Sequence, residues 1–509
     1  MTRTLPSAPQ STVWPRTDFD YIVVGAGSAG SIVAANLARR SPSCQVCLLE
    51  AGPAVDASQA TVWDPTQWLL VDRMTPLAWN YMSTPQAALN ARQIPMGRAK
   101  GLGGCALHNA MVYVRGGRLG YDRWAHALGC PGWSYAEIAP YFAAVEKRLH
   151  ITTAKADPFV DALVNSAAHH GLAYNADYNA RLDEACIAPF QFAIGPDGKR
   201  QTSFTAYDVA SLPNITIGSQ CTVERILFSG RRARAVCVGR VGGANLECSA
   251  RREVILAAGA INTPQLLMLS GIGPTDTLHA HGIPVIQALP GVGQNLQDDL
   301  FVTAGFASKQ PLPPQPYGLM GTVLFAHSPT NSRLLGTDIE CSLATGSLAG
   351  MGVPPEWQDS YWLFPNIQLL ESRGSVVLQS SDPYAAPIIN PNYLQTQGDL
   401  DRCVAALKLA HALGTDAALA PWLESPLLPG ANDTDLEAYV RATAGTCYHY
   451  AGTCKMGVDA MAVVAPDSLR VRGTEGLRVI DASIIPQTVS GNTAAATMMI
   501  AEKASRWLA

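Results

Sequence analysis

The sequence predicts an α/β protein in which a helix-covered parallel sheet is interleaved with a second lobe built on an antiparallel sheet with helices. Near the N-terminus, a strand, a glycine-rich turn, a helix and a second strand follow one another within about 30 residues, the size of a βαβ unit. Two more apolar strands, over 252–257 and 476–480, occur far downstream. The 509 residues also exceed what one compact core usually holds, so we expect at least two lobes.

The elements of the first unit can be placed by their patterns. Residues 21–24 and 44–49 are short apolar runs typical of buried parallel strands, and 31–40 is Ala-rich and helical in pattern. We expect the last helix over 493–508. If all of these belong to one sheet, the chain between them forms the second lobe.

Composition and charge exclude several classes of protein. Hydrophobic residues make up 48% of the chain and charged residues 15%, and the formal net charge is −4. Nothing here indicates a nucleic-acid or anionic membrane partner. No apolar run approaches the ~18 residues of a membrane span, and residues 1–17, rich in Pro, Ser and Thr, lack the apolar core of a signal peptide. We expect a disordered tail over 1–17, a cytoplasmic location, and a monomer or homodimer.

The twelve cysteines are scattered along the chain. Cys44 and Cys47 form a C-x-x-C, a spacing that occurs in redox and metal sites. They lie in a predicted strand, where residues three apart point to opposite faces. We therefore interpret them as buried core thiols, expect no metal site, and favour a reducing compartment.

The first glycine-rich turn has the spacing of a dinucleotide-binding site. Gly25, Gly27 and Gly30 stand between the first strand and the first helix, and Glu50 ends the second strand. In such turns the first glycine permits the tight turn, the second lets a pyrophosphate approach, and the third lets helix and strand pack closely. The helix N-terminus offers free N–H groups to phosphates, and a carboxylate at position 50 can bind ribose hydroxyls. The motif predicts a dinucleotide without separating FAD from NAD.

Further segments carry a family resemblance. Residues 99–109 read Ala-Lys-Gly-Leu-Gly-Gly-Cys-Ala-Leu-His-Asn, residues 259–273 begin Gly-Ala-Ile-Asn-Thr-Pro-Gln, and residues 447–457 contain His-Tyr-Ala-Gly-Thr. With 481–493, they resemble the glucose–methanol–choline (GMC) oxidoreductase family, in its order and spacing, from about residue 18 onward. The resemblance implies a Rossmann-type FAD-binding domain interleaved with a substrate domain on an antiparallel sheet, and FAD as the cofactor.

The resemblance and the glycine motif together predict the residues that contact FAD. Gly103 and Gly104 remove side chains where backbone passes along a flat ring, Asn109 is a short amide able to bond ring or backbone, and Asp481 is a partner for ribityl hydroxyls or phosphate-bound water. The full predicted set is Gly25, Gly27, Ser28, Ala29, Gly30, Glu50, Ala51, Gly103, Gly104, His108, Asn109, Ala110, Met111, Val112, Val223, Ala258, Gly259, Asp481, Ala482, Asn492 and Thr493.

His108 departs from the usual family pattern, in which an aliphatic residue is commoner at this position. In choline oxidases and some sugar dehydrogenases of the family, a histidine just before this asparagine is covalently bonded to the flavin. The resemblance therefore leaves two alternatives open: a covalent bond from His108 to FAD, or an unlinked His108 that packs against the flavin ring.

The segments between the sheet strands predict the second lobe. They hold long polar and Pro-rich loops, a strand-like run over 374–379 and an amphipathic helix over 399–413. We assign the chain to domains accordingly, with an FAD-binding domain over 18–149, 214–299 and 464–509, and a substrate-binding domain over 150–213 and 300–463.

The resemblance implies a catalytic pair, His449 and Asn492. Moving a hydride from an alcohol carbon to flavin N5 leaves a proton on oxygen, and a histidine titrates near neutral pH and can accept it. Asn492 cannot accept that proton, but it can donate a hydrogen bond to the forming alkoxide. The predicted activity is FAD-dependent oxidation of a small-molecule alcohol to an aldehyde or ketone, with O2 or another electron acceptor as the oxidant.

Three other functions stay open at this stage. Oxidase and dehydrogenase differ in access of O2 to the flavin, which depends on cavity shape. A hydroxynitrile-lyase-like enzyme on the same fold can retain the histidine. In a non-catalytic FAD-binding protein, His449 and Asn492 are relics.

The substrate is only weakly constrained. Either Glu340 or Glu371 can face the cavity and favour an amine-bearing alcohol such as choline, an aminosugar or a pyridoxine-like ring; the alternative is a solvated or core-paired carboxylate. Further candidates for the cavity wall, for which core packing is an equal account of the first three, are Met320, Trp362, Phe364, Tyr448 and Tyr450.

Overall fold

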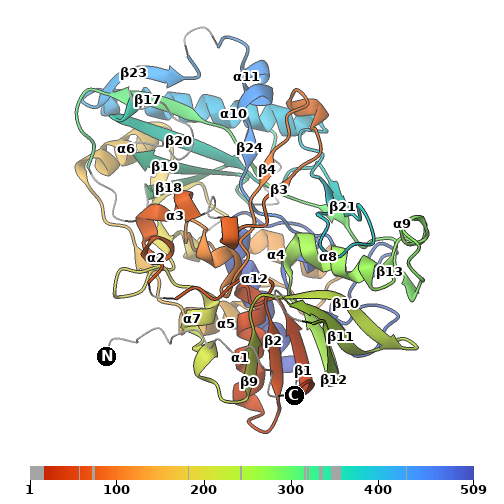
Figure 1. The fold of residues 1–509 in the computed structure, drawn as a ribbon. Coiled ribbons are helices and arrows are strands. Elements are labelled where there is room, and N and C mark those ends of the chain that lie inside the picture. The colour runs from red at the N-terminus through yellow and green to blue at the C-terminus, as the bar shows by residue number, and fades with distance from the viewer. Residues whose placement is uncertain are drawn as a thin grey trace.

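The computed structural model describes residues 16–508, apart from 57, 72–74, 182, 241–243, 314–316, 318–319, 332–335, 346–356 and 431–432. The predicted tail over 1–17 lies outside the described residues except for its last two. The rest forms two lobes, each built on its own sheet (Figure 1).

The first sheet has seven strands and a parallel centre. Strand β1 (Asp18–Val24) pairs in parallel with β2 and with β12, and its apolar residues are buried because helices cover both faces. In sheet order the strands are β10 (Cys221–Ser229), β11 (Arg232–Arg240), β12 (Leu246–Leu256), β1, β2 (Val46–Leu49) and β9 (Ile215–Gly218), with β25 (Leu477–Val479) paired in parallel to β12.

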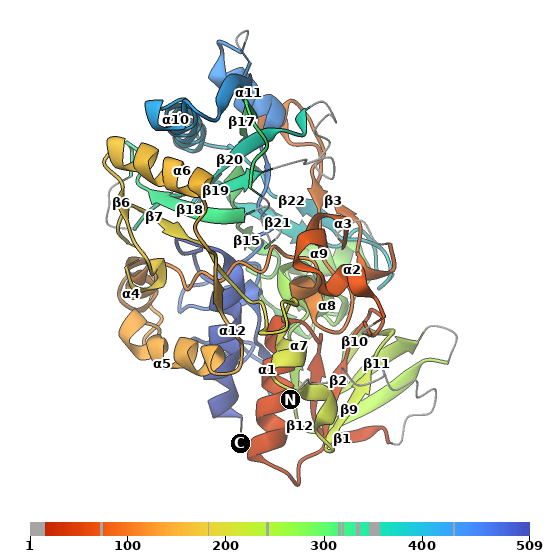
Figure 2. The ribbon, with the colours of Figure 1, turned by 90° about the vertical axis from the view of Figure 1, so that its left-hand side faces the viewer.

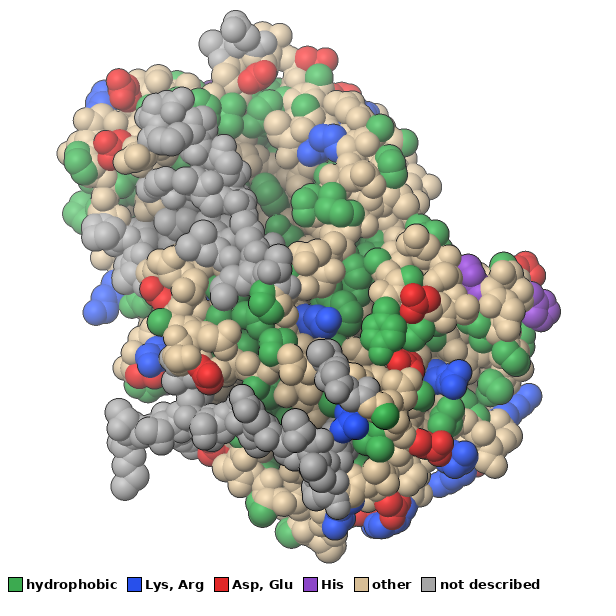
Figure 3. All heavy atoms as spheres, viewed as in Figure 1, with side chains coloured by type: hydrophobic (Ala, Val, Ile, Leu, Met, Phe, Trp, Pro, Cys, Tyr) green, Lys and Arg blue, Asp and Glu red, His purple; other side chains and the backbone are tan. Residues whose placement is uncertain are grey.

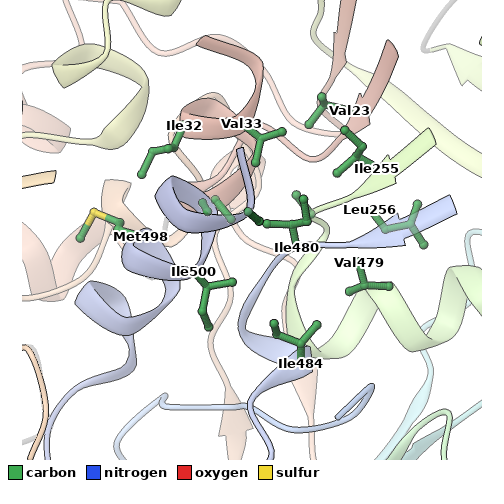
Figure 4. Packing of buried hydrophobic residues seen from close by; sticks show 14 of the residues in the cluster. Val23, Ile32, Val33, Ile255, Leu256, Val479, Ile480, Ile484, Met498 and Ile500 are labelled. Atoms are coloured by element: carbon green, nitrogen blue, oxygen red, sulfur yellow. The ribbon is translucent and has the colours of Figure 1, made fainter. Parts of the chain in front are cut away.

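Two helices from opposite ends of the chain cover this sheet together. Helix α1 (Ser28–Arg40) packs against α12 (Thr493–Ala504). Figure 4 shows their apolar side chains meeting those of the strands and of the 480–484 turn; it labels Val23, Ile32, Val33, Ile255, Leu256, Val479, Ile480, Ile484, Met498 and Ile500. The C-terminal segment is therefore part of the dinucleotide-binding lobe.

The second sheet is almost entirely antiparallel. Helices α6 (Pro158–His169) and α10 (Gln397–Gly414) pack on one of its faces and share a hydrophobic core with it (Figure 2). Its path is β23 (Leu423–Leu428), β17 (Ala304–Ser308), β20 (Ser360–Ile367), β19 (Ile339–Thr345), β18 (Met320–Ala326), β7 (Cys186–Pro189) and β6 (Ala173–Tyr174), with β16 (Leu300–Phe301) paired to β20 and to β24 (Gly445–Thr446).

Smaller elements join the lobes and cover their edges. A three-stranded sheet lies beside α8 (Gly259–Leu269) and is formed by β15 (Gln294–Leu296), β21 (Gly374–Val377) and β22 (Ile388–Asn390). The remaining helices are α2 (Ala60–Trp63), α3 (Trp68–Val71), α4 (Arg118–His126), α5 (Tyr135–Glu146), α7 (Ser203–Ala206), α9 (Thr275–Ala280) and α11 (Leu436–Thr443). The short strand pairs are β3 (Tyr81–Met82) with β4 (Pro95–Met96), β5 (Thr152–Thr153) with β8 (Gln191–Phe192), and β13 (Ile272–Gly273) with β14 (Gln287–Ala288).

The predicted fold class is confirmed. The amphipathic helix expected over 399–413 is α10, and the strand expected over 374–379 is β21. The second strand begins at Val46 rather than at Cys44, because Cys44 donates its backbone N–H to Ser41 in a turn. Cys44 and Cys47 are both buried and unbonded, as predicted for core thiols.

The surface and helices bear on the predicted partners. On the face shown in Figure 3, Lys and Arg side chains are interspersed with Asp and Glu. Among the described helices, none is both long and apolar enough to cross a bilayer. The described residues also contain no cluster of three or more His, Cys, Asp or Glu side chains placed to bind a metal ion.

Two glycines are required by close backbone contacts. A Cβ on Gly30 would lie 1.9 Å from the carbonyl oxygen of Gly25, so α1 can pack on its strand only without a side chain there. Gly104 has a φ of +57°, and a Cβ on it would lie 2.5 Å from Gly27 Cα. Gly104 was predicted to free space beside a ring, but its lack of a side chain is also demanded by packing of the two glycine segments against each other.

We expect Gly30→Ala to lower the free energy of unfolding by about 2 kcal/mol or more, because overpacking at a rigid backbone contact forces α1 to shift. The matched control is Gly27→Ala. Gly27 has a φ of −76° and its Cβ would meet nothing closer than 3.7 Å. Thermal unfolding of the two FAD-free proteins checks this, and equal midpoints would contradict the packing argument.

Candidate functional site

A cavity of about 860 Å³ runs from the first glycine turn to the underside of the antiparallel sheet. It therefore touches both lobes, and His449 lies in its wall. Of the predicted cofactor contacts, those that line it are Gly25, Gly27, Ser28, Ala29, Glu50, Ala51, Gly104, His108, Asn109, Ala110, Val112, Val223, Ala258, Gly259, Asp481, Ala482, Asn492 and Thr493.

Three predicted contacts lie off the cavity. Gly30 is turned toward Gly25 and the sheet, as described above. Gly103 donates its backbone N–H to the carbonyl of Ala26 at 2.9 Å and so joins the two glycine segments. Met111 is only 1% exposed, and its carbonyl accepts a hydrogen bond from the N–H of Ala193. These three residues support the cavity wall instead of facing the cavity.

The two predicted acidic contacts are already hydrogen-bonded within the protein. Glu50 accepts backbone N–H bonds from Ala26 (3.0 Å) and Gly52 (2.9 Å), which fixes its carboxylate at the end of β2. Burial raises the pKa of Glu50, although these N–H groups favour the ionised form. Each oxygen of Glu50 retains a second lone pair for a ligand.

Asp481 has a more structural position than predicted. One oxygen accepts bonds from the N–H of Gly259 (2.9 Å) and the hydroxyl of Thr263 (2.6 Å), and the other accepts two bonds from Ser483. Four donors occupy the carboxylate, so its main effect is to hold the start of α8 against the 481–484 turn. The prediction that Asp481 serves chiefly as a ribityl or water partner is corrected accordingly.

A mismatch between two backbone segments presents His449 to the cavity. Leu300 pairs with Thr446, and Gln297 pairs with Ala451. Between these two pairs, residues 298–299 stand opposite residues 447–450, so the longer segment bulges outward. Within the bulge Tyr448 adopts a left-handed backbone with a φ of +63°. The bulge turns the next side chain, His449, away from the sheet.

Both aspartates opposite the bulge bind His449. Asp298 accepts the backbone N–H of His449 at 2.8 Å, and Asp299 Oδ2 lies 2.8 Å from its Nδ1. Because a carboxylate can only accept, the Nδ1 atom carries the proton and Nε2 is left with a free lone pair. Nε2 lies 2.9 Å from the Nδ2 atom of Asn492, which donates to it. The result is a chain from Asp299 through His449 to Asn492.

The aspartates are themselves held firmly. Asp298 also accepts hydrogen bonds from the hydroxyls of Tyr393 and Thr446, and Thr446 in turn receives the backbone N–H of Tyr448. Burial raises the pKa of Asp298 to about 6, against the opposing effect of these hydroxyls. Asp299 is 0% exposed, and burial raises its pKa despite the hydrogen bond to His449.

The pKa of His449 is raised by its surroundings. Burial by itself lowers the pKa, but the hydrogen bond to Asp299 and the charges of Asp299, Glu340 and Asp298 outweigh it. A stronger base results, which is in its neutral, proton-accepting form only at pH values above this raised pKa.

Asn492 stands at the N-cap of α12, yet its side chain does not cap the helix. An asparagine here usually accepts an N–H of the first helical turn. Instead its amide reaches His449, and Asn492 Oδ1 is buried without a hydrogen-bond partner among the described residues. The first N–H groups of α12 are therefore available to a ligand, at the positive end of the helix dipole.

The remaining predictions for the wall divide between cavity and core. Glu340, Phe364, Tyr448 and Tyr450 line the cavity. Glu371 is exposed outside it, Trp362 is buried in the core with its indole N–H bonded to Ser360, and the side chain of Met320 lies outside the described residues.

Sequence reasoning missed other residues of the wall. Asp298 and Asp299 carry no motif signal, and they lie about 150 residues from His449, so only the strand pairing brings them together. Arg98 was also missed. Its guanidinium lies 4.5 Å from the ring centroid of Tyr450 and donates to the carbonyl of Tyr448. Two adjacent acids before a short apolar run, Leu300–Phe301, were the available signal for the first pair.

Comparison with known proteins agrees with this geometry. Family models described as GMC oxidoreductase match residues 19–301 and 371–501. An oxygen-dependent choline dehydrogenase from Paraburkholderia phymatum is 35% identical over 537 residues, covering 96% of this chain and 91% of the relative. The crystal structure of pyridoxine 4-oxidase from Mesorbium loti has 30% identity and a TM-score of 0.88, covering 96% and 98% of the two chains. A formate oxidase from Aspergillus oryzae has 25% identity and a TM-score of 0.89, covering 97% and 98%.

The fold and the site thus define an oxidoreductase with a dinucleotide-binding lobe and a histidine base candidate in a cavity between two lobes. The chain belongs to the GMC oxidoreductase family.

We expect Asp299→Asn to slow alcohol oxidation about 100-fold, because an amide no longer fixes the proton on Nδ1 of His449. Loss of the negative charge also lowers the pKa of His449. The acid limb of the kcat/KM profile therefore moves to lower pH. Kinetics across pH check this, with FAD content and thermal unfolding as controls for folding. An acid limb at its original pH would contradict the role given to Asp299.

Proposed function

We propose that this protein oxidises the CH–OH group of a small-molecule alcohol to an aldehyde or ketone, with FAD as its cofactor. The observation that carries the proposal is the hydrogen-bonded chain from Asp299 through His449 to Asn492, which ends on the cavity. A base with a fixed tautomer and a neighbouring amide donor are the two groups that removal of a hydroxyl proton requires.

The residues present fit FAD. The glycine turn at the start of α1 has no side-chain cap, so its N–H groups are free for the pyrophosphate, and Glu50 stands one strand away for the ribose. Residues 108–112, in part, and the N-terminus of α12 line the cavity where the flavin ring would lie. The orphaned Oδ1 atom of Asn492 is a further polar group that a ligand can satisfy. When bound, the flavin supplies the hydride acceptor.

The chain's own residues handle the proton. An alcohol hydroxyl inserted between His449 and Asn492 would donate to Nε2 and accept from Nδ2, replacing one hydrogen bond with two. His449 Nε2 then takes the proton, while Asp299 stabilises the imidazolium that forms. Asn492 Nδ2 stabilises the negative charge on oxygen, a contribution of about 3 kcal/mol for a donor of this kind.

The relatives support this activity. A choline dehydrogenase described as oxygen-dependent and a pyridoxine 4-oxidase both act on alcohols, and their names favour O2 as the acceptor here. We keep O2 or another acceptor as the proposal, and expect hydrogen peroxide as a product if O2 is the acceptor.

We also propose the domain division predicted from the sequence. All strands of the seven-stranded sheet fall within 18–149, 214–299 and 464–509, and all strands of the antiparallel sheet fall within 150–213 and 300–463. This agreement supports an FAD-binding domain over the first three segments and a substrate domain over the other two.

We expect an alcohol substrate to bleach the flavin in the absence of O2, and His449→Ala to slow that reduction at least ~100-fold. Stopped-flow absorbance measures it. Control variants at other histidines, such as the exposed His279, should reduce at the normal rate. Product formation without bleaching would instead indicate lyase chemistry, and no reaction in any alcohol would leave a non-catalytic FAD-binding protein.

We further propose that His108 forms a covalent bond to the flavin. His108 is 8% exposed, lines the cavity and is hydrogen-bonded to the Cys105 side chain. Burial raises the pKa of Cys105, but the charge of Arg98 and the contact with His108 outweigh it and lower the pKa to about 6. A thiolate beside His108 would hold the ring in one orientation.

If the bond forms, acid precipitation should leave the yellow colour with the polypeptide, and His108→Ala should release it to the supernatant. Absorbance of the two fractions and the mass of the flavin-bearing peptide measure the outcome. Flavin fully released from the unmodified protein would contradict the bond and leave His108 as a packing residue.

A further inference from the structure

The antiparallel sheet presents one polar end and one apolar end to the cavity. Alternation along β19 places Glu340, Ser342 and Ala344 on the cavity side, while Cys341 and Leu343 face the core beneath α10. On β20, Phe364 and Asn366 also line the cavity, and the cross-strand pairing sets Asn366 beside Glu340. The polar end therefore consists of Glu340 and Asn366, next to the bulge that carries His449.

Glu340 is a buried carboxylate without a cationic partner in the described part of the chain. It is 2% exposed, and one oxygen accepts a 2.7 Å hydrogen bond from the side-chain amide of Gln368. The amide of Gln368 cannot turn, because its oxygen accepts the backbone N–H of Gly491 at 2.8 Å. The other oxygen of Glu340 accepts no hydrogen bond from the described residues. Burying a carboxylate in this way is costly unless a ligand compensates it.

The charges around this end of the cavity have the same sign. Asp299 and Asp298 lie just behind His449, and each raises the pKa of the histidine together with Glu340. The groups whose charges bear on Glu340 are His449, Asp299, Cys447 and Tyr178, none of them a permanent cation. Arg98 lies at the opposite side, over the ring of Tyr450. A neutral His449 thus leaves the polar end with net negative charge.

We propose that Glu340 binds a positively charged nitrogen of the substrate, so that the enzyme selects alcohols that carry a cation close to the carbinol carbon. The inference rests on the proposed function, because it takes the carbinol to lie between His449 and Asn492. Glu340 is then a specificity-determining residue, and the acidic surroundings of His449 disfavour anionic hydroxy acids.

Isosteric substrate pairs test the charge alone. Choline is compared with its neutral isostere, in which carbon replaces nitrogen, and N-methylpyridinium methanol with methylbenzyl alcohol. We expect kcat/KM for the better cation to exceed that for its isostere by about 100-fold, the range seen when a buried charge pair is broken. In Glu340→Gln this preference should collapse to within about 5-fold, through loss of the cation rather than of the neutral alcohol.

Two variants serve as controls. Glu371→Gln makes the same chemical change at an exposed glutamate outside the cavity and should keep the preference. Glu340→Asp retains the charge on a shorter side chain and should keep part of it, which separates loss of charge from misfolding. FAD content and thermal unfolding accompany each variant.

A binding measurement decides the proposal even if no alcohol in the panel is oxidised. Ethyltrimethylammonium, which lacks the hydroxyl, is titrated calorimetrically into the FAD-bound enzyme at pH 6 in two buffers that differ in ionisation enthalpy. Burial raises the pKa of Glu340 to about 7, so a bound cation should expel its proton, about 0.5 proton or more per ligand. Glu340→Gln should bind at least about 30-fold more weakly and release only what His449 releases.

The outcomes separate the two proposals. Equal rates for cationic and neutral partners, or a cation affinity unchanged in Glu340→Gln, would overturn the role of Glu340 and leave alcohol oxidation standing. Cation binding that depends on Glu340, without flavin reduction by any alcohol, would sustain this role and overturn the proposed reaction.

Discussion

The rest of the site depends on the hydrogen bond between Asp299 and His449. That bond fixes the proton on Nδ1 and leaves Nε2 as an acceptor facing the cavity. It exists because β16 pairs with β24 and sets two residues, 298–299, against the four of the 447–450 bulge. A backbone mismatch has thus become a chemical device: the bulge supplies the base, and the short segment supplies both carboxylates that hold it.

The bond joins the lobes as well as the proton relay. His449 leaves β24 of the antiparallel sheet, whereas Asn492 begins α12, which packs on α1 above the parallel sheet. Each lobe therefore supplies one member of the pair across the cavity. Asp481 stabilises the parallel-sheet side of this arrangement by holding α8 to the turn before α12. The separation of His449 from Asn492, 2.9 Å, depends on the packing of both lobes.

The sequence predicted what depends on local pattern. The glycine spacing located the first turn, and Gly30 meets Gly25 as the motif requires. His449 and Asn492 lie together as the resemblance implied. Long-range pairing was out of reach: no pattern in Gln297-Asp298-Asp299 connects it to a histidine about 150 residues later, and the four donors on Asp481 come from three separate segments. Glu340 and Glu371 were indistinguishable by type, and only the register of β19 with β20 put one of them in the cavity.

The acidic surroundings of His449 have opposing effects that a neutral substrate would not resolve. Asp299, Asp298 and Glu340 raise the pKa of His449, which strengthens the base but narrows the pH range in which it is free to accept a proton. A cation beside Glu340 offsets that carboxylate's charge, so the pKa of His449 falls when the substrate binds. The base is then deprotonated at the moment the hydroxyl arrives. A neutral alcohol would leave the negative charge uncompensated, so the same carboxylate that selects the substrate also prepares the histidine for it.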